Sequence, residues 1–166
     1  MSIEYRFCPI CGSKLINIST NVKECVRCKE RFYKNPVPAV ASILFNKKRE
    51  ILLVKRGEEP KKGMWALPGG FMEVRETVED AVIRETEEET GLKMEDIKLL
   101  DVATEDSKRY TTVLLVSFFS DKFSGEMAPG DDSVEVKFFY FKNIPEIAFS
   151  SHRRFINKFF EIMRWK

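Results

Sequence analysis

The sequence predicts an α/β fold in which strands lie between two helices, a three-layer α/β/α sandwich, preceded by a small cysteine-rich module. Three observations indicate this architecture. Apolar runs rich in β-branched and aromatic residues recur after residue 37. Helical signals frame residues 78–90 and the stretch that begins at Ser151. All four cysteines lie within the first 36 residues. Strands covered by helices on both faces form three layers.

Composition limits the size, partners and location of the protein. A chain of 166 residues with 43% hydrophobic residues can bury a core and predicts one main domain with a small appendage. A net charge of +2 indicates no overall attraction to nucleic acid. No apolar run approaches the ~20 residues of a membrane span, and the N-terminal residues show no signal-peptide pattern. We therefore expect a cytoplasmic protein without a membrane partner.

The cysteines form two CxxC pairs, Cys8 with Cys11 and Cys25 with Cys28, separated by thirteen residues. This pattern predicts a four-thiolate zinc site, a zinc ribbon. Two disulfides are the alternative, which an intracellular setting and the short spacing disfavour. Because so short a segment has too little core to fold unaided, zinc should supply much of its stability. Four thiolates leave no open position for water, which predicts a structural metal.

The turns, charge and boundary of the ribbon can also be predicted. Gly12 favours a tight turn after the first knuckle, whereas Lys29 at the equivalent place suits that turn less well. Residues 1–36 carry seven Lys and Arg against three Asp and Glu. This excess permits nucleic-acid contact but does not require it. Two prolines stiffen the linker that follows, so we place the domains at 1–36 and 37–166.

The body of the chain alternates apolar strands with turns and helices. The runs AVASILF and EILLVKR are separated by a charged turn at residues 46–49, which predicts a hairpin. Residues 57–64 form a predicted loop, and further predicted strands are IKLLDVATED, TTVLLVSFFS and VEVKFFYF. The apolar face of the helix from Ser151 consists of Phe155, Ile156, Phe159, Phe160 and Met163.

The helix predicted at residues 78–90 combines an apolar stripe with acidic residues. Thr77 and Asp80 resemble a capping box at its start, and Gly91 stands where it ends. On a helical wheel, three carboxylates fall within or beside the stripe of Val78, Ala81 and Val82, those of Glu85, Glu88 and Glu89. An acidic, solvated helix is the alternative. Carboxylates crowded on an inward face repel one another and gather cations, and their spacing suits Mg²⁺ or Mn²⁺.

This segment resembles the Nudix hydrolase signature. The signature is a Gly, five residues, a Glu, seven residues, Arg-Glu, an apolar residue, any residue, Glu-Glu, any residue, Gly and an apolar residue. The chain supplies these in register at Gly70, Glu76, Arg84, Glu85, Glu88, Glu89, Gly91 and Leu92. Thr86 stands where the family prefers an aliphatic residue, and Arg75 where many members have Gly. We expect Arg75 to alter the loop or to narrow the choice of substrate.

The resemblance extends to MWALPGGF, covers most of residues 37–166, and implies the same sandwich with a mixed sheet. It also implies metal-assisted hydrolysis of a phosphoanhydride. Glu88 and Glu89 would be the principal metal ligands, helped by the Gly69 carbonyl. Glu85 would bind a metal or take a proton from water. Arg84 would pair with Glu88 and orient these carboxylates, or contact phosphate instead.

Residues outside the helix complete the implied site. Glu76 would position the loop or a metal-bound water. In many Nudix enzymes an acid from a distant loop joins the site, and the candidate here is Glu135, with Asp131 and Asp132 as neighbours. The candidates for binding the phosphate or base of a substrate are Arg56, Phe71, Lys108, Arg109 and Tyr110. His152, the only histidine, is expected to be structural.

The order of a zinc ribbon and a Nudix domain resembles the NADH pyrophosphatases. Those enzymes carry a Ser-Gln-Pro-Trp-Pro-Phe-Pro stretch after the signature, but the equivalent region here reads LLDVATEDSKRYTTVLLVSFF. We therefore expect hydrolysis of ADP-ribose or another nucleoside-diphosphate derivative. One alternative is an NADH or dinucleotide pyrophosphatase. Another is a catalytically silent nucleotide sensor whose ribbon contacts nucleic acid, and RNA-end processing is a further hypothesis that the near-neutral charge disfavours. Nudix proteins often pair, so a homodimer is compatible with the sequence.

Overall fold

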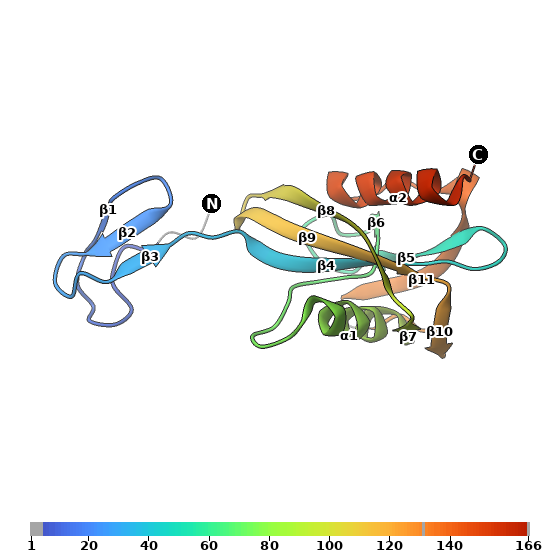
Figure 1. Cartoon of the computed structure of the whole chain (residues 1–166), viewed down its shortest axis with the longest axis horizontal. Helices are drawn as coiled ribbons and strands as arrows, with labels where there is room; N and C mark the ends of the chain where they lie inside the picture. The colour runs from blue at the N-terminus through green and yellow to red at the C-terminus, as the bar shows by residue number, and fades with distance from the viewer. Residues whose placement is uncertain (1–4, 131, 166) are drawn as a thin grey trace. The chain divides into compact units, whose positions relative to one another are not determined.

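The computed structural model describes residues 5–130 and 132–165 (Figure 1). The chain forms two compact units. One contains residues 1–37 with 106–113, and the other contains 38–105 with 114–166. Among the described residues, no helix has the length and apolar character that would cross a membrane.

The ribbon contains a three-stranded antiparallel sheet of β1 (Leu15–Asn17), β2 (Val22–Cys25) and β3 (Arg31–Tyr33). Leu15 pairs with Cys25, and both join Cys8 in a small buried cluster. Cys11 and Phe32 pack against this cluster. So small a core supports the expectation that a metal contributes to the stability of the ribbon.

Three further sheets form the body of the protein. The first has the order β4 (Val37–Leu44), β9 (Thr111–Ser120) and β8 (Lys98–Ser107). The second has the order β11 (Ser133–Tyr140), β5 (Glu50–Arg56) and β6 (Trp65–Ala66). The third pairs β10 (Lys122–Gly125) with β7 (Leu92–Glu95). Strands β6, β7 and β10 were not predicted, because strands of two to four residues are too short to show a periodicity.

The strand directions give a mixed sheet, as the resemblance implied. The pairs of β5 with β6 and β11, and of β7 with β10, are antiparallel. Strands β4 and β9 run in the same direction in Figure 1. At their C-terminal ends the Phe45 N–H donates to the Ser120 carbonyl at 3.1 Å.

The hairpin predicted from AVASILF and EILLVKR is wrong. Strands β4 and β5 belong to different sheets, although the Phe45–Ile51 bridge joins their ends. Asn46 Oδ1 makes the turn between them by accepting from the Lys48 N–H at 2.9 Å. Both strands are largely buried. Their pairing is therefore decided by packing between the helices and not by the local turn.

Helix α1 (Val78–Thr90) has the predicted span. Thr77 Oγ1 accepts from the Asp80 N–H at 3.1 Å, and Gly91 ends the helix with a φ of 70°. Ala81 and Val82 of α1 are fully buried in a hydrophobic cluster that also contains Val40, Leu44, Leu52 and Phe118. Figure 1 shows α1 on one face of the strands and α2 on the other, which confirms the three-layer sandwich.

Helix α2 (Ser150–Met163) begins one residue earlier than predicted. Its predicted apolar face is buried at Phe155, Ile156 and Phe159 and half-buried at Phe160 and Met163. The carboxylate of Glu105 in β8 accepts from the Ser151 N–H at 2.7 Å and from Ser150 Oγ at 2.9 Å. A side chain from a distant strand therefore caps this helix.

Candidate active site

The three carboxylates of α1 lie in different environments. Glu89 is buried with 8% of its surface exposed. Glu85 is half-buried, whereas the Glu88 side chain is 43% exposed. The helical wheel places all three within or beside the apolar stripe. The structure turns Glu88 outward, because the buried stripe runs through Val82, Thr86 and Glu89.

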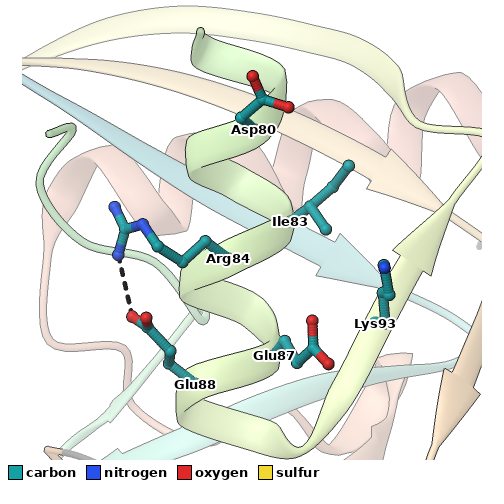
Figure 2. Close-up of a pocket in the computed structure, with 6 residues that line it drawn as sticks. All are labelled: Asp80, Ile83, Arg84, Glu87, Glu88 and Lys93. Atoms are coloured by element: carbon teal, nitrogen blue, oxygen red, sulfur yellow. Dashed lines mark hydrogen bonds and ion pairs between the residues drawn. The ribbon is translucent and has the colours of Figure 1, made fainter. Parts of the chain in front are cut away.

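Arg84 gathers three carboxylates around one guanidinium. Its Nε and Nη2 donate to the two oxygens of Glu76 at 2.8 and 3.0 Å. Its Nη1 donates to Glu85 Oε1 at 2.8 Å and to Glu88 Oε2 at 2.9 Å, the latter drawn in Figure 2. Nη2 also donates to the Phe71 carbonyl at 3.1 Å. All five N–H groups are therefore engaged, and the predicted pairing of Arg84 with Glu88 is confirmed.

The bidentate contact with Arg84 lowers the pKa of Glu76 to about 2. Glu76 therefore stays ionised and ties the loop before α1 to the helix. Because each N–H of Arg84 already has a protein acceptor, this arrangement favours the orienting role of Arg84 over direct contact with phosphate.

The turn at Gly69 and Gly70 approaches the carboxylates closely. The Gly69 N–H donates to Glu89 Oε2 at 2.9 Å. A Cβ on Gly70 would overlap the Glu85 carboxylate, so only glycine permits this approach. Burial raises the pKa of Glu89 to about 7 and also raises the pKa of Glu85. Partly buried carboxylates of this kind favour neutralisation by a cation.

A shallow hollow of about 370 Å³ lies beside Glu88 on the outer side of α1 (Figure 2). Its lining residues are Asp80, Ile83, Arg84, Glu87, Glu88 and Lys93. Glu88 therefore belongs both to the carboxylate group and to an open surface, from which ions and substrate can approach.

The loop residues 126–130 and 132, with Ser133 at the start of β11, pack against the C-terminal end of α1. The Gly130 N–H at 3.2 Å and Ser133 Oγ at 2.8 Å both donate to the Glu89 carbonyl. The Gly57 N–H donates to the Asp132 carbonyl at 2.6 Å. Burial is the main cause of the raised pKa of Glu89, and the charge of Asp132 adds to it. From the sequence, Asp132 was only a neighbour of the candidate Glu135, because a tertiary contact places this loop.

The structure does not bring Glu135 to the carboxylates of α1. Glu135 is exposed, and its Oε2 lies 3.4 Å from Nζ of Lys55, its cross-strand neighbour. The next residue, Val136, packs on the cluster that α1 covers. Because side chains alternate along a strand, Glu135 points away from α1. Asp131, its other predicted companion, lies outside the described residues.

The predicted substrate residues have separate surroundings. Arg56 is half-buried, its Nε donates to the Pro60 carbonyl at 2.8 Å, and its guanidinium lies 5.2 Å from the Phe149 ring centroid. The charge of Arg56 lowers the pKa of Glu89, whereas burial has the larger effect and raises it. Phe71 is 43% exposed next to Gly70. Lys108, Arg109 and Tyr110 belong to the other unit, where Arg109 stacks on the Tyr110 ring.

His152 is buried and its Nδ1 accepts from the Leu67 N–H at 3.1 Å. Burial lowers its pKa to about 4. A neutral imidazole that binds a backbone N–H in the interior agrees with the expected structural role.

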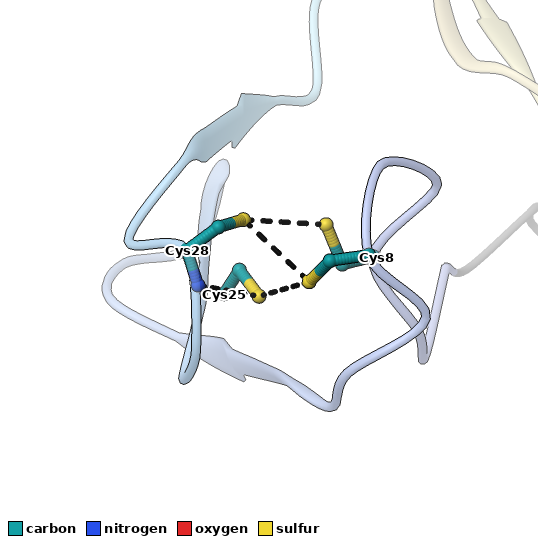
Figure 3. A group of neighbouring side chains, drawn as sticks. Cys8, Cys25 and Cys28 are labelled. Atoms are coloured by element: carbon teal, nitrogen blue, oxygen red, sulfur yellow. Dashed lines mark hydrogen bonds between the residues drawn. The ribbon is translucent and has the colours of Figure 1, made fainter.

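The four cysteine thiols converge in the ribbon (Figure 3). The sulfur pairs Cys8–Cys28 and Cys11–Cys28 are 3.7 Å apart and Cys11–Cys25 is 3.4 Å apart, and all four sulfurs lie within 4.8 Å. A tetrahedral zinc with Zn–S bonds of ~2.3 Å needs sulfurs ~3.8 Å apart. The four cysteines are free thiols, which favours a metal site over the disulfide alternative. Across residues 5–130 and 132–165, no carboxylate group converges as tightly as these four thiols.

Both CxxC knuckles end in a left-handed residue, Gly12 with φ 70° and Lys29 with φ 60°. Their N–H groups donate to the carbonyls of Cys8 at 2.9 Å and Cys25 at 3.1 Å. The second knuckle therefore makes the same turn as the first, with a residue for which that conformation is less favourable.

Known proteins resemble this chain in sequence and in architecture. A sequence model of the NUDIX domain matches residues 35–159. The ADP-ribose pyrophosphatase of Methanocaldococcus jannaschii is 44% identical over 139 residues, which cover 83% of this chain and 79% of that protein. The NAD-capped RNA hydrolase NudC of Vibrio vulnificus is 28% identical over 150 residues, or 89% of this chain and 56% of that enzyme. The chain thus spans about half the length of this second relative.

A solved structure resembles almost the whole chain. The crystal structure of a NUDIX hydrolase from Nitrosomonas europaea matches with a TM-score of 0.73 and 28% sequence identity, covering 96% of this chain and 92% of that one.

Proposed function

The chain belongs to the Nudix family, and we propose that it hydrolyses the diphosphate linkage of a nucleoside-diphosphate derivative, preferably ADP-ribose. The observation that carries the proposal is the group of carboxylates gathered around Arg84 and the Gly69–Gly70 turn. The 44% identity to an ADP-ribose pyrophosphatase supports the choice of substrate.

The donor set of this group suits Mg²⁺ or Mn²⁺. Glu85 Oε1 and Glu88 Oε2 both lie within 2.9 Å of one cationic nitrogen of Arg84, so two carboxylate oxygens already point at a positive charge. Such oxygens are the ligands these ions prefer. We propose that Glu85, Glu88, Glu89 and the Gly69 carbonyl hold the catalytic ions. Such ions, when bound, neutralise the diphosphate and lower the pKa of the attacking water.

Other residues would orient these groups. Glu76 fixes Arg84 by its two contacts, and Arg84 in turn holds Glu85, which we propose accepts the proton of the attacking water. For the acid from a distant loop we propose Asp132 in place of Glu135, since its loop contacts the end of α1. Arg56, whose neighbour Gly57 bonds to the Asp132 backbone, is proposed to bind a substrate phosphate.

The proposal is tested by incubating the protein with Mg²⁺ or Mn²⁺ and a panel of ADP-ribose, NADH, nucleoside triphosphates and NAD-capped RNA. Products are identified by mass, so that the cleaved bond is known. We expect AMP and ribose 5-phosphate from ADP-ribose at the highest kcat/KM. Tight binding of a nucleotide without turnover of any panel member would instead favour the silent sensor.

The metal ligands are tested by Glu88→Gln and Glu89→Gln. Each should lower turnover by orders of magnitude and leave the circular dichroism spectrum unchanged, because removing one charge from a crowded acidic group relieves repulsion. The matched control is Glu79→Gln, an exposed residue of the same helix outside the lining of the hollow, which should retain activity. Full activity of both ligand variants would contradict the assigned roles.

The cysteine site is proposed to hold one structural Zn²⁺, since its sulfur spacing fits tetrahedral coordination. Metal analysis of freshly purified, reduced protein should give one zinc per chain. Replacing any of the four cysteines by serine should abolish it. Zinc-free protein would reject the site. Free thiols in such a site also fit the proposed location in the reducing cytoplasm.

A dinucleotide or NAD-capped RNA is the second candidate substrate. The observation in its favour is the four-cysteine ribbon ahead of the Nudix domain, together with the similarity to NudC over 89% of the chain. A higher kcat/KM for NADH or capped RNA than for ADP-ribose in the same panel would establish this candidate.

A further inference from the structure

Arg75 lies in the loop that joins the Gly69–Gly70 turn to α1. Its side chain is exposed, and its backbone is left-handed with a φ of 73°. Arg84 fixes this loop on both sides of Arg75, through the Phe71 carbonyl at 3.1 Å and through the carboxylate of Glu76. The Glu73 N–H closes the loop by donating to Glu76 Oε2 at 3.0 Å. Arg75 is therefore held on a well-anchored segment beside the carboxylate group.

The charge around Arg75 gives it a distinct position. Residues 71–90 contain eight Asp and Glu but only two Arg, a net charge of −6. All N–H groups of Arg84 donate hydrogen bonds to protein acceptors. In the described residues, no carboxylate lies within ion-pair distance of Arg75. Arg75 is thus the cation of this segment whose guanidinium is open to an anionic ligand.

We infer that Arg75 is a specificity-determining residue that binds a phosphate oxygen of the substrate; the inference deepens the proposed function and rests on it. A diphosphate approaching this acidic segment is repelled by it, and an exposed guanidinium on its rim offsets that repulsion with a charge-assisted hydrogen bond. A glycine at this position would suit the backbone better but would offer no charge. Arg75 therefore accepts a less favourable backbone conformation and provides a ligand-binding group in return.

The chain provides a matched control at Arg49. This residue is also exposed and left-handed, with a φ of 60°, and lies in the turn between β4 and β5. The turn follows the C-terminal end of β4, whereas Phe71 of the Arg75 loop bridges to Ala39 near the start of that strand. A glycine at either position removes the same energetic cost of the left-handed backbone. A difference in diphosphate binding between the two variants therefore reports on the arginine side chain.

The experiment compares wild type with Arg75→Gly, Arg75→Lys and Arg49→Gly. Calorimetry measures the binding of inorganic diphosphate in Mg²⁺, and steady-state kinetics measure KM and kcat for ADP-ribose. Arg75→Gly should weaken diphosphate binding and raise KM about tenfold, with kcat changed less than about twofold. Arg75→Lys keeps the charge and should stay within about threefold of wild type. Both glycine variants should raise Tm by about 2 °C, and Arg49→Gly should bind like wild type.

Several results would overturn the inference. These are wild-type affinity of Arg75→Gly for diphosphate, an equal loss in Arg49→Gly, or no binding of diphosphate by the wild-type protein. A distinct result bears on the proposed function: if diphosphate binding depends on Arg75 but ADP-ribose is not hydrolysed, the assigned substrate is wrong and the role of Arg75 stands.

Discussion

Thr86 Oγ1 on α1 lies 2.8 Å from Ser42 Oγ on β4, and both residues are fully buried. Thr86 Oγ1 also lies 2.6 Å from the Val82 carbonyl, to which it donates. Ser42 Oγ has one further contact, the Pro68 carbonyl at 3.4 Å. Where the Nudix signature favours an aliphatic residue, this chain therefore has two hydroxyls that satisfy each other between the helix of carboxylates and β4.

We expect Thr86→Val to lower the free energy of unfolding by about 1–2 kcal/mol, because Ser42 Oγ then loses its nearest partner. The double variant, Thr86→Val with Ser42→Ala, also removes the Ser42 hydroxyl that the single change leaves without this partner. The double variant should therefore be more stable than the sum of the single changes predicts, by about 1 kcal/mol. Urea unfolding of the four proteins measures this coupling. Additive effects would show that the two hydroxyls act independently.

The positions of Asp132 and Glu135 predict opposite outcomes for two similar substitutions. Asp132→Asn should lower kcat at least about tenfold, since its loop contacts the end of α1 and its charge reaches Glu89. Glu135→Gln should leave kcat within about twofold, because Glu135 faces Lys55 on the other face of β11. Initial rates with saturating Mg²⁺ and ADP-ribose distinguish them. Loss of activity in Glu135→Gln alone would restore Glu135 as the distant acid.

The sequence predicted what depends on local or periodic signals. The limits of α1 follow from Thr77, Asp80 and Gly91, whose effects act within one helical turn. The two CxxC knuckles likewise placed the four thiols of the ribbon correctly. The pairing of Arg84 with Glu88 was also predicted, because residues four apart are neighbours on a helix.

Features that depend on tertiary packing were not predictable in this way. The buried strands β4 and β5 separate into different sheets, although a turn joins them. Glu105 caps α2 from β8, and Asp132 approaches α1 through a loop about forty residues further along the chain. The facing of Glu135 could not be predicted either, because an irregular register between Ser133 and Glu135 changes which side chains share a face of β11.

Gly12 and Lys29 predict a difference in how the two knuckles hold zinc. Gly12→Ala should lower zinc affinity about fivefold, because the left-handed conformation is about 1 kcal/mol less favourable for alanine than for glycine. No atom lies within 4 Å of the added Cβ, so no steric clash contributes. Lys29→Gly should keep or raise the zinc affinity, since glycine adopts the left-handed conformation of Lys29 at lower cost. Competition with a chromogenic chelator measures both. Equal affinities in all three proteins would show that these turns do not limit binding.

His152 predicts a dependence of stability on pH. Its imidazole packs edge-on against the Phe149 ring. Its pKa is lowered to about 4 mainly by burial, with a raising effect of Glu105 and a lowering effect of Arg56. In the unfolded chain the pKa is near 6.5. Above pH 6.5 both states are neutral and the full stability is present. As pH falls from 6.5 to 4, only the unfolded state gains the proton, so the free energy of unfolding falls by up to about 3 kcal/mol.

His152→Asn isolates this effect, because asparagine offers an oxygen to the Leu67 N–H and does not titrate. The stability of wild type relative to this variant should decrease by up to about 1.4 kcal/mol per pH unit between pH 6 and 4.5. Acidic groups common to both proteins cancel in the comparison. His152 is the only histidine, so its imidazole NMR signals also report the pKa directly. Titration near 6.5 in the folded protein, or a stability difference that does not change with pH, would contradict a buried neutral imidazole.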